Sequence, residues 1–204
     1  MTKATIFTIG HSNHSIERFL GLLGDAEINM VVDVRSAPFS RMFPHFNQDS
    51  LKKSLAEKSI GYLFLGESIG GRSNDPEDYV DGQVVYGLLA KKDSFKSGMI
   101  RLKDGASKYR IAIMCSEKEP LDCHRTLLVS EGLTEMGIEV GHIHADGSIE
   151  SHQHALARLL RLHNLSAPNL FSDDSARLEE ALTLQEKKIA FQFSEANGTR
   201  EEFE

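Results

Sequence analysis

Short apolar runs recur along the first three quarters of the chain, separated by polar, glycine-containing stretches. Five runs of five or six residues are rich in β-branched and aromatic side chains, which is typical of buried strands. One of them, MVVDV, is apolar on both faces, as in a central strand of a parallel sheet. The runs cover residues 4–9, 30–34, 60–65, 110–114 and 138–143.

The segments between these runs carry helical signals. Ser15 is suited to cap an amphipathic helix that ends at Gly24 and Asp25. Strands that alternate with helices indicate a single α/β domain, in which a mostly parallel central sheet of about five strands has helices on both faces. We expect a Rossmann-like, three-layer arrangement. The other helices are predicted at 49–58, 121–136 and 149–162, with helical segments across 79–108.

The chain changes character near residue 165. Residues 1–165 contain all the predicted strands, so we assign them to one α/β domain. Residues 166–204 have a helix start at Ser172-Asp173-Asp174, a modest apolar stripe and a polar end, EANGTREEFE. We expect this second part to be an acidic, helical C-terminal extension.

Ionisable side chains follow directly after the predicted strands. His11 follows the first strand, Asp33 and Arg35 end the second, Arg72 lies in a glycine-rich loop after the third, and Cys115 follows the fourth. Ligands of open parallel sheets bind outside the carboxyl ends of the strands. We therefore expect His11, Asp33, Arg35 and Cys115 to surround a common cleft at one edge of the sheet.

The strongest chemical signal is CSEKEPLDCHR, which runs from Cys115 to Arg125 and contains Glu117. It is predicted to end in the first turn of a helix, where unpaired N–H groups and a partial positive charge favour anions. A thiol at Cys123, beside His124 and Arg125, would ionise readily there. The alternative is a pair of buried, inert thiols.

Two arginine-containing loops are candidates for gripping an anion. Asp33 and Arg35 alternate along the strand and share a face. Arg35 and Arg41, with the hydroxyl group of Ser40, form one anion-binding set, and an internal Asp33–Arg35 salt bridge is the alternative. Arg72 follows two glycines and would close over a substrate, unless it is simply a solvated loop residue.

The turn Gly10-His11-Ser12 occupies the place of the phosphate-binding turn in nucleotide-binding sheets. Because of this position, we expect an anion contact at Gly10 and Ser12. The second and third glycines of the dinucleotide motif are missing, so we expect no cofactor. His11 is a candidate general base or ligand, and a buried structural histidine is the alternative.

Composition narrows the classes of function. The chain has 204 residues and a net charge of −7, which disfavours nucleic-acid binding over the whole surface. No apolar run approaches the roughly 18 residues of a membrane span, and the N-terminal sequence does not resemble a signal peptide. With two cysteines and no disulfide framework, the chain is expected in a reducing compartment, so we expect a cytoplasmic protein without a membrane partner.

Several motifs together resemble the bacterial and archaeal domain-of-unknown-function 488 family: TIGHSNHS, DVRSAPFSR, IGGR and CSEKEPLDCHR, in this order. The resemblance covers roughly residues 4–150, and QEKKIAFQ near the end is also similar. It implies a compact α/β domain and names no reaction. One departure is Ser68-Ile69 before the two glycines, where the family more often has a leucine–glycine step. The family's characteristic positions fall on Gly10, His11, Ser12, Asp33, Arg35, Pro38, Ser40, Arg41, Gly71, Arg72, Cys115, Glu117, Cys123, His124 and Arg125.

We interpret these residues first as an enzyme that uses a cysteine thiolate on a small phosphate- or nucleotide-like anion. Cys115 or Cys123 is the candidate nucleophile, and His11 or His124 would transfer protons. Four arginines would hold and neutralise the anion, while two carboxylates would orient the arginines or a histidine. These residues are Arg35, Arg41, Arg72 and Arg125, with Asp33 and Glu117.

Two other classes stay open. A non-catalytic module for nucleotides or nucleic acid would use the same arginines, and its binding would fall steeply with salt. A metalloprotein would use Cys115, Cys123 and a histidine. Against a metal, the chain has no close cysteine pair, and adjacent Cys123 and His124 point different ways from a helix. We expect no metal, and we leave assembly into a homo-oligomer open.

Overall fold

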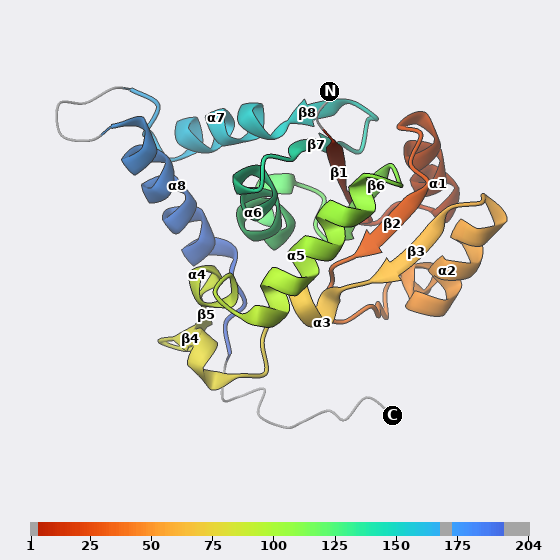
Figure 1. Ribbon diagram of the computed structural model, residues 1–204, viewed down its shortest axis with the longest axis horizontal. Helices are drawn as coiled ribbons and strands as arrows, with labels where there is room; N and C mark the ends of the chain where they lie inside the picture. The colour runs from red at the N-terminus through yellow and green to blue at the C-terminus, as the bar shows by residue number, and fades with distance from the viewer. Residues whose placement is uncertain (1–3, 168–172, 194–204) are drawn as a thin grey trace.

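The fold is described from a computed structural model, which describes residues 4–167 and 173–193 (Figure 1). The polar end EANGTREEFE and part of the predicted extension lie outside the described residues. A six-stranded sheet forms the centre, in the order β3-β2-β6-β1-β7-β8. Its strands are β1 (Thr5–Gly10), β2 (Met30–Asp33), β3 (Gly61–Phe64), β6 (Ile111–Cys115), β7 (Glu139–Ile143) and β8 (Ile149–Ser151).

The five predicted strands are present, and they are parallel to one another. A sixth strand, β8, pairs antiparallel with β7, so that Ile149 lies opposite Ile143. The helix predicted from residue 149 therefore begins only at His152, as α7 (His152–Leu162). The turn before β8 contains Gly147 with φ 97°, which lets the chain reverse and pair.

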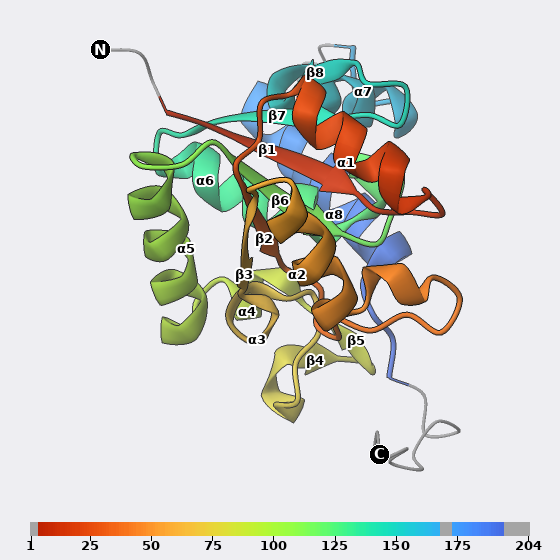
Figure 2. The ribbon, with the colours of Figure 1, turned by 90° about the vertical axis from the view of Figure 1, so that its right-hand side faces the viewer.

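Helices cover both faces of the sheet, which confirms the predicted three-layer arrangement (Figures 1 and 2). Phe7 and Ile9 belong to the core beneath α1 (Ile16–Asp25) and α2 (Gln48–Glu57), whereas Ile6 belongs to the core on the other face. This alternation follows from the two-residue period of a strand. The other face is covered by α5 (Asp93–Ala106), α6 (Glu131–Glu135), α7 and α8 (Asp174–Ile189).

The prediction of helical segments across 79–108 was only partly right. The stretch begins with a two-stranded hairpin, β4 (Tyr79–Val80) and β5 (Gln83–Val84), before α4 (Tyr86–Leu89) and α5. Asp81 and Gly82 both have positive φ, 50° and 75°, as a tight two-residue hairpin turn requires. This Asp-Gly signal is visible in the sequence.

The single helix predicted at 121–136 is divided. A 3-10 turn, η3 (Pro120–Asp122), comes first, and Cys123 follows in an extended conformation, with φ −143° and ψ 141°. The helix then contains a π-helical segment, η4 (Arg125–Ser130), before α6. The Ser130 hydroxyl donates a 2.7 Å hydrogen bond to the Arg125 carbonyl, which stabilises this wider turn. π-helical turns are frequent at functional sites. The remaining short elements are η1 (Pro44–Phe46), α3 (Gly66–Ile69) and η2 (Pro76–Asp78).

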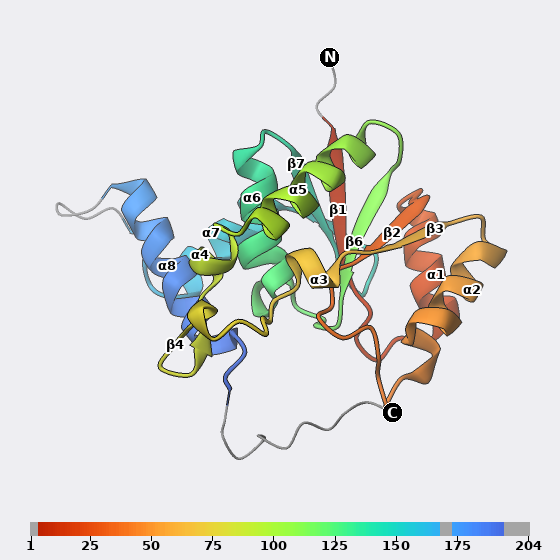
Figure 3. The ribbon, with the colours of Figure 1, turned by 60° about the horizontal axis from the view of Figure 1, so that its bottom comes forward.

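Helix α8 packs against α7 and η3 and lies beside α4 (Figures 1 and 3). Its Gln185 is fully buried and donates hydrogen bonds to the Leu121 carbonyl and to Asp122 Oδ1. After α8 the chain runs along β5, where the Val84 N–H donates to the Phe191 carbonyl. Among the described residues, none of the helices is both long and apolar enough to cross a membrane.

Candidate functional site

A cavity of about 760 Å³ lies among the loops that follow β2, β3 and β6. Its wall also includes α4 and the segment after α8, so it joins parts of the chain that are far apart in sequence. The cavity brings together the predicted site residues Arg35, Arg41, Arg72, Cys115, Glu117, Cys123 and His124. Other residues in its wall are Ser36, Ala37, Phe39, Gly71, Tyr86, Ser116, Asp122, Ile189 and Phe191.

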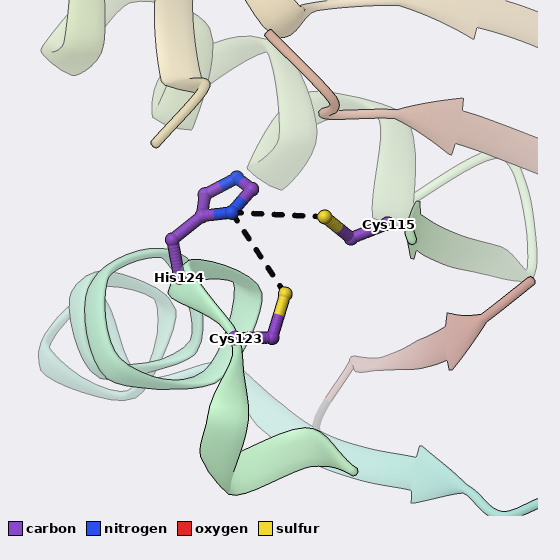
Figure 4. Close-up of side chains that lie close together, drawn as sticks. All are labelled: Cys115, Cys123 and His124. Carbon is purple, nitrogen blue, oxygen red and sulfur yellow. Dashed lines mark hydrogen bonds between the residues drawn. The ribbon is translucent and has the colours of Figure 1, made fainter. Parts of the chain in front are cut away.

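Cys115, Cys123 and His124 form a compact cluster in the wall of this cavity, with their side chains pointing toward one another (Figure 4). Nδ1 of His124 lies 3.7 Å from Sγ of Cys115 and 3.8 Å from Sγ of Cys123. The three atoms all lie within 4.8 Å of one another. Cys115 ends β6, and the other two residues begin the helix that follows η3, so the strand-to-helix connection itself assembles the cluster.

The orientation of the His124 ring is fixed from two sides. Its Nε2 lies 3.1 Å from the Val34 carbonyl, and because a carbonyl can only accept, this nitrogen carries the proton and donates. Nδ1 is therefore the ring atom that faces both sulfurs. Gly71 packs against the ring so closely that a Cβ there would lie 2.7 Å from Cγ of His124.

The two thiols differ in acidity. Burial opposes ionisation of Cys123, yet the hydrogen bond from Cys115 and the charge of Arg125 hold the pKa of Cys123 well below its ordinary value. The pKa of Cys115 is raised well above its ordinary value, first by its hydrogen bond to Cys123 and then by burial. The pair therefore carries one negative charge more readily than two.

Asp33 and Arg35 form the internal salt bridge that was one of the two interpretations of this pair. Arg35 Nη2 lies 2.6 Å from Asp33 Oδ2, and both side chains are buried. The same nitrogen donates to the Phe46 carbonyl, and the Tyr62 hydroxyl donates to Asp33 at 2.8 Å. Arg35 nevertheless contributes to the cavity wall, whereas Asp33 lies behind it.

His11 is a buried neighbour of the salt bridge and is not part of the cavity wall. Its ring stacks on Phe46 at 4.4 Å, and its Nδ1 lies 2.9 Å from the Ser12 carbonyl. Nε2 is 3.4 Å from Nη1 of Arg35, so the neutral ring accepts from the guanidinium. Burial is the main reason that the pKa of His11 falls to about 4.

Arg125 is fully buried behind the cavity rather than in its wall. Its Nη1 donates to the Glu117 carbonyl at 2.7 Å and Nη2 to that of Lys118 at 3.3 Å, so it holds the loop after β6. Gly10 lies against the same carbonyl of Glu117, which leaves no room for a Cβ. The Glu117 side chain lines the cavity, and burial raises its pKa.

Ser12 and Ser40 also lie outside the cavity wall. The Ser12 N–H donates to the Ser116 carbonyl at 2.9 Å and so braces the loop after β6. Ser40 Oγ accepts from the Phe43 N–H at 3.1 Å and stabilises its own turn. Both serines thus support the loops from which the cavity is built.

A family model described as Domain of unknown function DUF488 matches residues 15–131, which include the loop after β2 and the whole cysteine cluster. The chain belongs to this DUF488 family. No curated protein matches the chain, and neither does any solved structure.

In this DUF488 protein, three aromatic residues of the cavity were missed from the sequence, and Phe39 is the one that lies within the motif DVRSAPFSR. Tyr86 comes from α4, and Phe191 from the segment after α8, where the Arg72 guanidinium lies 4.4 Å above its ring. Tyr86 has no chemical motif around it. Phe191 lies in QEKKIAFQ, which we expected to resemble the family and which lies beyond the residues that the family model matches.

Proposed function

We propose that this protein is an enzyme that binds a small phosphate- or nucleotide-like anion in the cavity and attacks it with the thiolate of Cys123. The observation that carries the proposal is the meeting of two thiols and an oriented imidazole in the wall of an arginine-lined cavity. A nucleophile beside a base that is itself held by a third group is the recurring arrangement of covalent catalysis. Here the third group is the Val34 carbonyl.

Each residue has a defined part in the step. Cys123 stands at the start of a helix, because its carbonyl accepts from the Thr126 N–H at 3.0 Å. Before the attack, the thiol proton has passed to Nδ1 of His124, and the thiolate Sγ then bonds to the electrophilic atom of the substrate. The leaving group departs with its electron pair and takes the proton back from His124. Arg41 and Arg72 attract the anion, while Arg35 holds the wall of the cavity.

The proposal is tested with two alkylating reagents that share a leaving group and differ in charge. Iodoacetate is an anion and iodoacetamide is neutral, so the ratio of their rates reports attraction of an anion into the cavity. In the folded protein at neutral pH, we expect Cys123 to react and the ratio to exceed that of the unfolded chain. Arg72→Gln should lower the ratio by up to about fivefold, because an exposed charge pair contributes about 0.2–1 kcal/mol.

The matched control is Arg101→Gln, which removes an exposed arginine on α5 that does not line the cavity. It should leave the ratio unchanged. Mass spectrometry assigns the modified cysteine, and Cys123→Ser should abolish the reaction of the folded protein. Two cysteines that react only after unfolding would refute the thiolate proposal. If inorganic phosphate then still bound in a salt-dependent manner, a non-catalytic binding module would take its place.

A further inference from the structure

The two sulfurs of the cluster lie at nearly equal distances from a single imidazole nitrogen, 3.7 Å and 3.8 Å. Nε2 of His124 is engaged with Val34, so Nδ1 has one position left for a hydrogen bond. Nδ1 makes one well-directed hydrogen bond, whether the proton is on the nitrogen or on a sulfur. The two sulfurs therefore compete for this one hydrogen bond. A hydrogen bond to the imidazole thus holds only one of the two sulfurs, and the other is placed at the same distance from Nδ1 without a bond of its own to the ring.

The spacing instead matches ligands arranged around one cation. With Zn–S bonds of about 2.3 Å and Zn–N bonds of about 2.0–2.1 Å, tetrahedral ligand atoms lie roughly 3.5–3.8 Å apart. The upper end of this range is the S···S separation and the lower end the N···S separation. The two N···S distances are about 0.1–0.3 Å longer than the lower end, and the limit of 4.8 Å on all three pairs also admits the S···S separation. Cys123 can take part although it precedes His124, because its backbone is extended rather than helical.

The surroundings also suit a metal ligand set. A histidine that binds a metal usually donates its other ring N–H to a carboxylate or a carbonyl, as His124 does to Val34. Two thiolates and an imidazole favour soft or borderline cations over Mg²⁺ and Ca²⁺, which require oxygen ligands. Because the cluster forms part of the cavity wall, a fourth coordination position would face the cavity.

We propose that Cys115 Sγ, Cys123 Sγ and His124 Nδ1 bind one zinc-class divalent cation, with the fourth position facing the cavity. Coordination engages both sulfurs and the imidazole nitrogen, so the metal-bound protein and the free nucleophile are mutually exclusive states. The cation thus regulates the thiol chemistry of the same site. This regulatory consequence rests on the proposed function, whereas the cation site itself does not.

Cobalt(II) is the probe, because its tetrahedral thiolate complexes absorb strongly in the visible and near ultraviolet. We expect reduced, metal-free protein to take up one equivalent of Co²⁺ with these bands, and Zn²⁺ to displace it, because Zn²⁺ has no d-electron preference that opposes tetrahedral coordination. Cys123→Ser and His124→Ala should each remove the tetrahedral spectrum. The control His154→Ala changes an exposed histidine and should keep it.

A parallel alkylation experiment separates the two proposals. One equivalent of Zn²⁺ should slow the reaction of the folded protein with iodoacetamide at least tenfold, and a chelator should restore the rate. Thiols that alkylate in the folded protein without any tetrahedral Co²⁺ spectrum would overturn the cation site and leave the proposed function standing. A Co²⁺ spectrum in a protein whose metal-free thiols stay inert would support the cation site and overturn the thiolate enzyme.

Discussion

At the scale of single residues, the charges around the cavity fall into two groups. Arg35 and Arg125 are buried and already hold other parts of the protein, the first through Asp33 and the second through the loop after β6. Arg41 and Arg72 are exposed in the wall of the cavity, where a ligand can reach them. The sequence shows all four arginines but not which two of them are buried, because burial is set by the tertiary fold.

The buried pair predicts a large loss of stability on Asp33→Asn. The substitution leaves the Arg35 guanidinium buried without its counterion, and breaking such a pair typically costs about 3–5 kcal/mol. Tyr62→Phe, which removes one hydrogen bond to the same carboxylate, should cost about 0.5–1.5 kcal/mol. Urea unfolding followed by circular dichroism measures both losses.

The exposed control is Asp25→Asn, at the end of α1, which should stay within about 0.5 kcal/mol of the natural protein. If Asp33→Asn lost no more stability than this control, the ion pair would not support the loop after β2. Such a result would leave Arg35 free for a ligand.

At the scale of elements, the apolar runs predicted the five parallel strands, because four of them are mostly buried and β-branched and the half-buried β3 is still apolar, with the sequence GYLF. Periodicity missed β8, whose three residues alternate with no clear apolar face and pair only because Gly147 turns the chain back. It also missed the π-helical segment after Cys123. That segment depends on the bond from Ser130 to the Arg125 carbonyl, and the same apolar pattern suits an ordinary α-helix.

The close packing of α3 and its following loop against the cluster predicts a specific effect of Gly71→Ala. The added Cβ would meet the His124 ring at 2.7 Å, so the ring or the loop must shift, and we expect this shift to disturb the hydrogen bond to Val34. Loss of that hydrogen bond should cost about 0.5–1.5 kcal/mol. The ring nitrogen signals of His124 in NMR spectra should shift accordingly.

Gly21→Ala provides the contrast within a helix. Apart from chain neighbours and the backbone of its own helix, no atom of the described chain lies within 4 Å of the position of a Cβ there, so alanine should stabilise α1 by about 0.5–1 kcal/mol.

Unchanged His124 signals in Gly71→Ala would show that Gly71 does not position the ring.

At the scale of the whole molecule, the site is assembled from segments that are distant in sequence. The strand-end rule anticipated the meeting of Arg35 and Cys115, because it follows from parallel topology alone. It also placed His11 and Asp33 around the same cleft, and both lie outside the cavity wall. It did not anticipate the contribution of α4 and α8, since nothing in an amphipathic pattern says where a helix docks. Gln185 shows how the docking matters, because its amide binds η3 immediately before Cys123.

A second long-range connection is a buried chain of hydrogen bonds across the sheet. The Thr8 hydroxyl donates to His142 Nδ1 at 2.8 Å, and His142 Nε2 donates to His152 Nδ1 at 3.0 Å. His152 Nε2 then donates to Glu131 at 2.7 Å. The chain joins β1, β7, α7 and α6, and it requires a neutral His142.

This network predicts that the protein loses stability as the pH falls. Burial first, and then repulsion from the ionisable neighbours His152, Arg125, His144 and Arg158, lowers the pKa of His142 from 6.5 to about 2. Between these values, the unfolded chain binds a proton at His142 and the folded protein does not. The free energy of unfolding should therefore fall by about 1.4 kcal/mol per pH unit below pH 6.5 from this residue alone.

The measurement compares the natural protein with His142→Asn by urea unfolding at several pH values from 7.5 to 4.5. At pH 7.5, the variant should be the less stable of the two, because it disturbs the buried network. Below pH 6.5, the difference should narrow by about 1.4 kcal/mol per unit, since the variant has no proton to gain at this position on unfolding. The control His154→Asn, at an exposed position of α7, should show no such narrowing. Parallel curves for His142→Asn and the natural protein would mean that the folded state accommodates a charged His142, and the neutral relay from Thr8 to Glu131 would have to be abandoned.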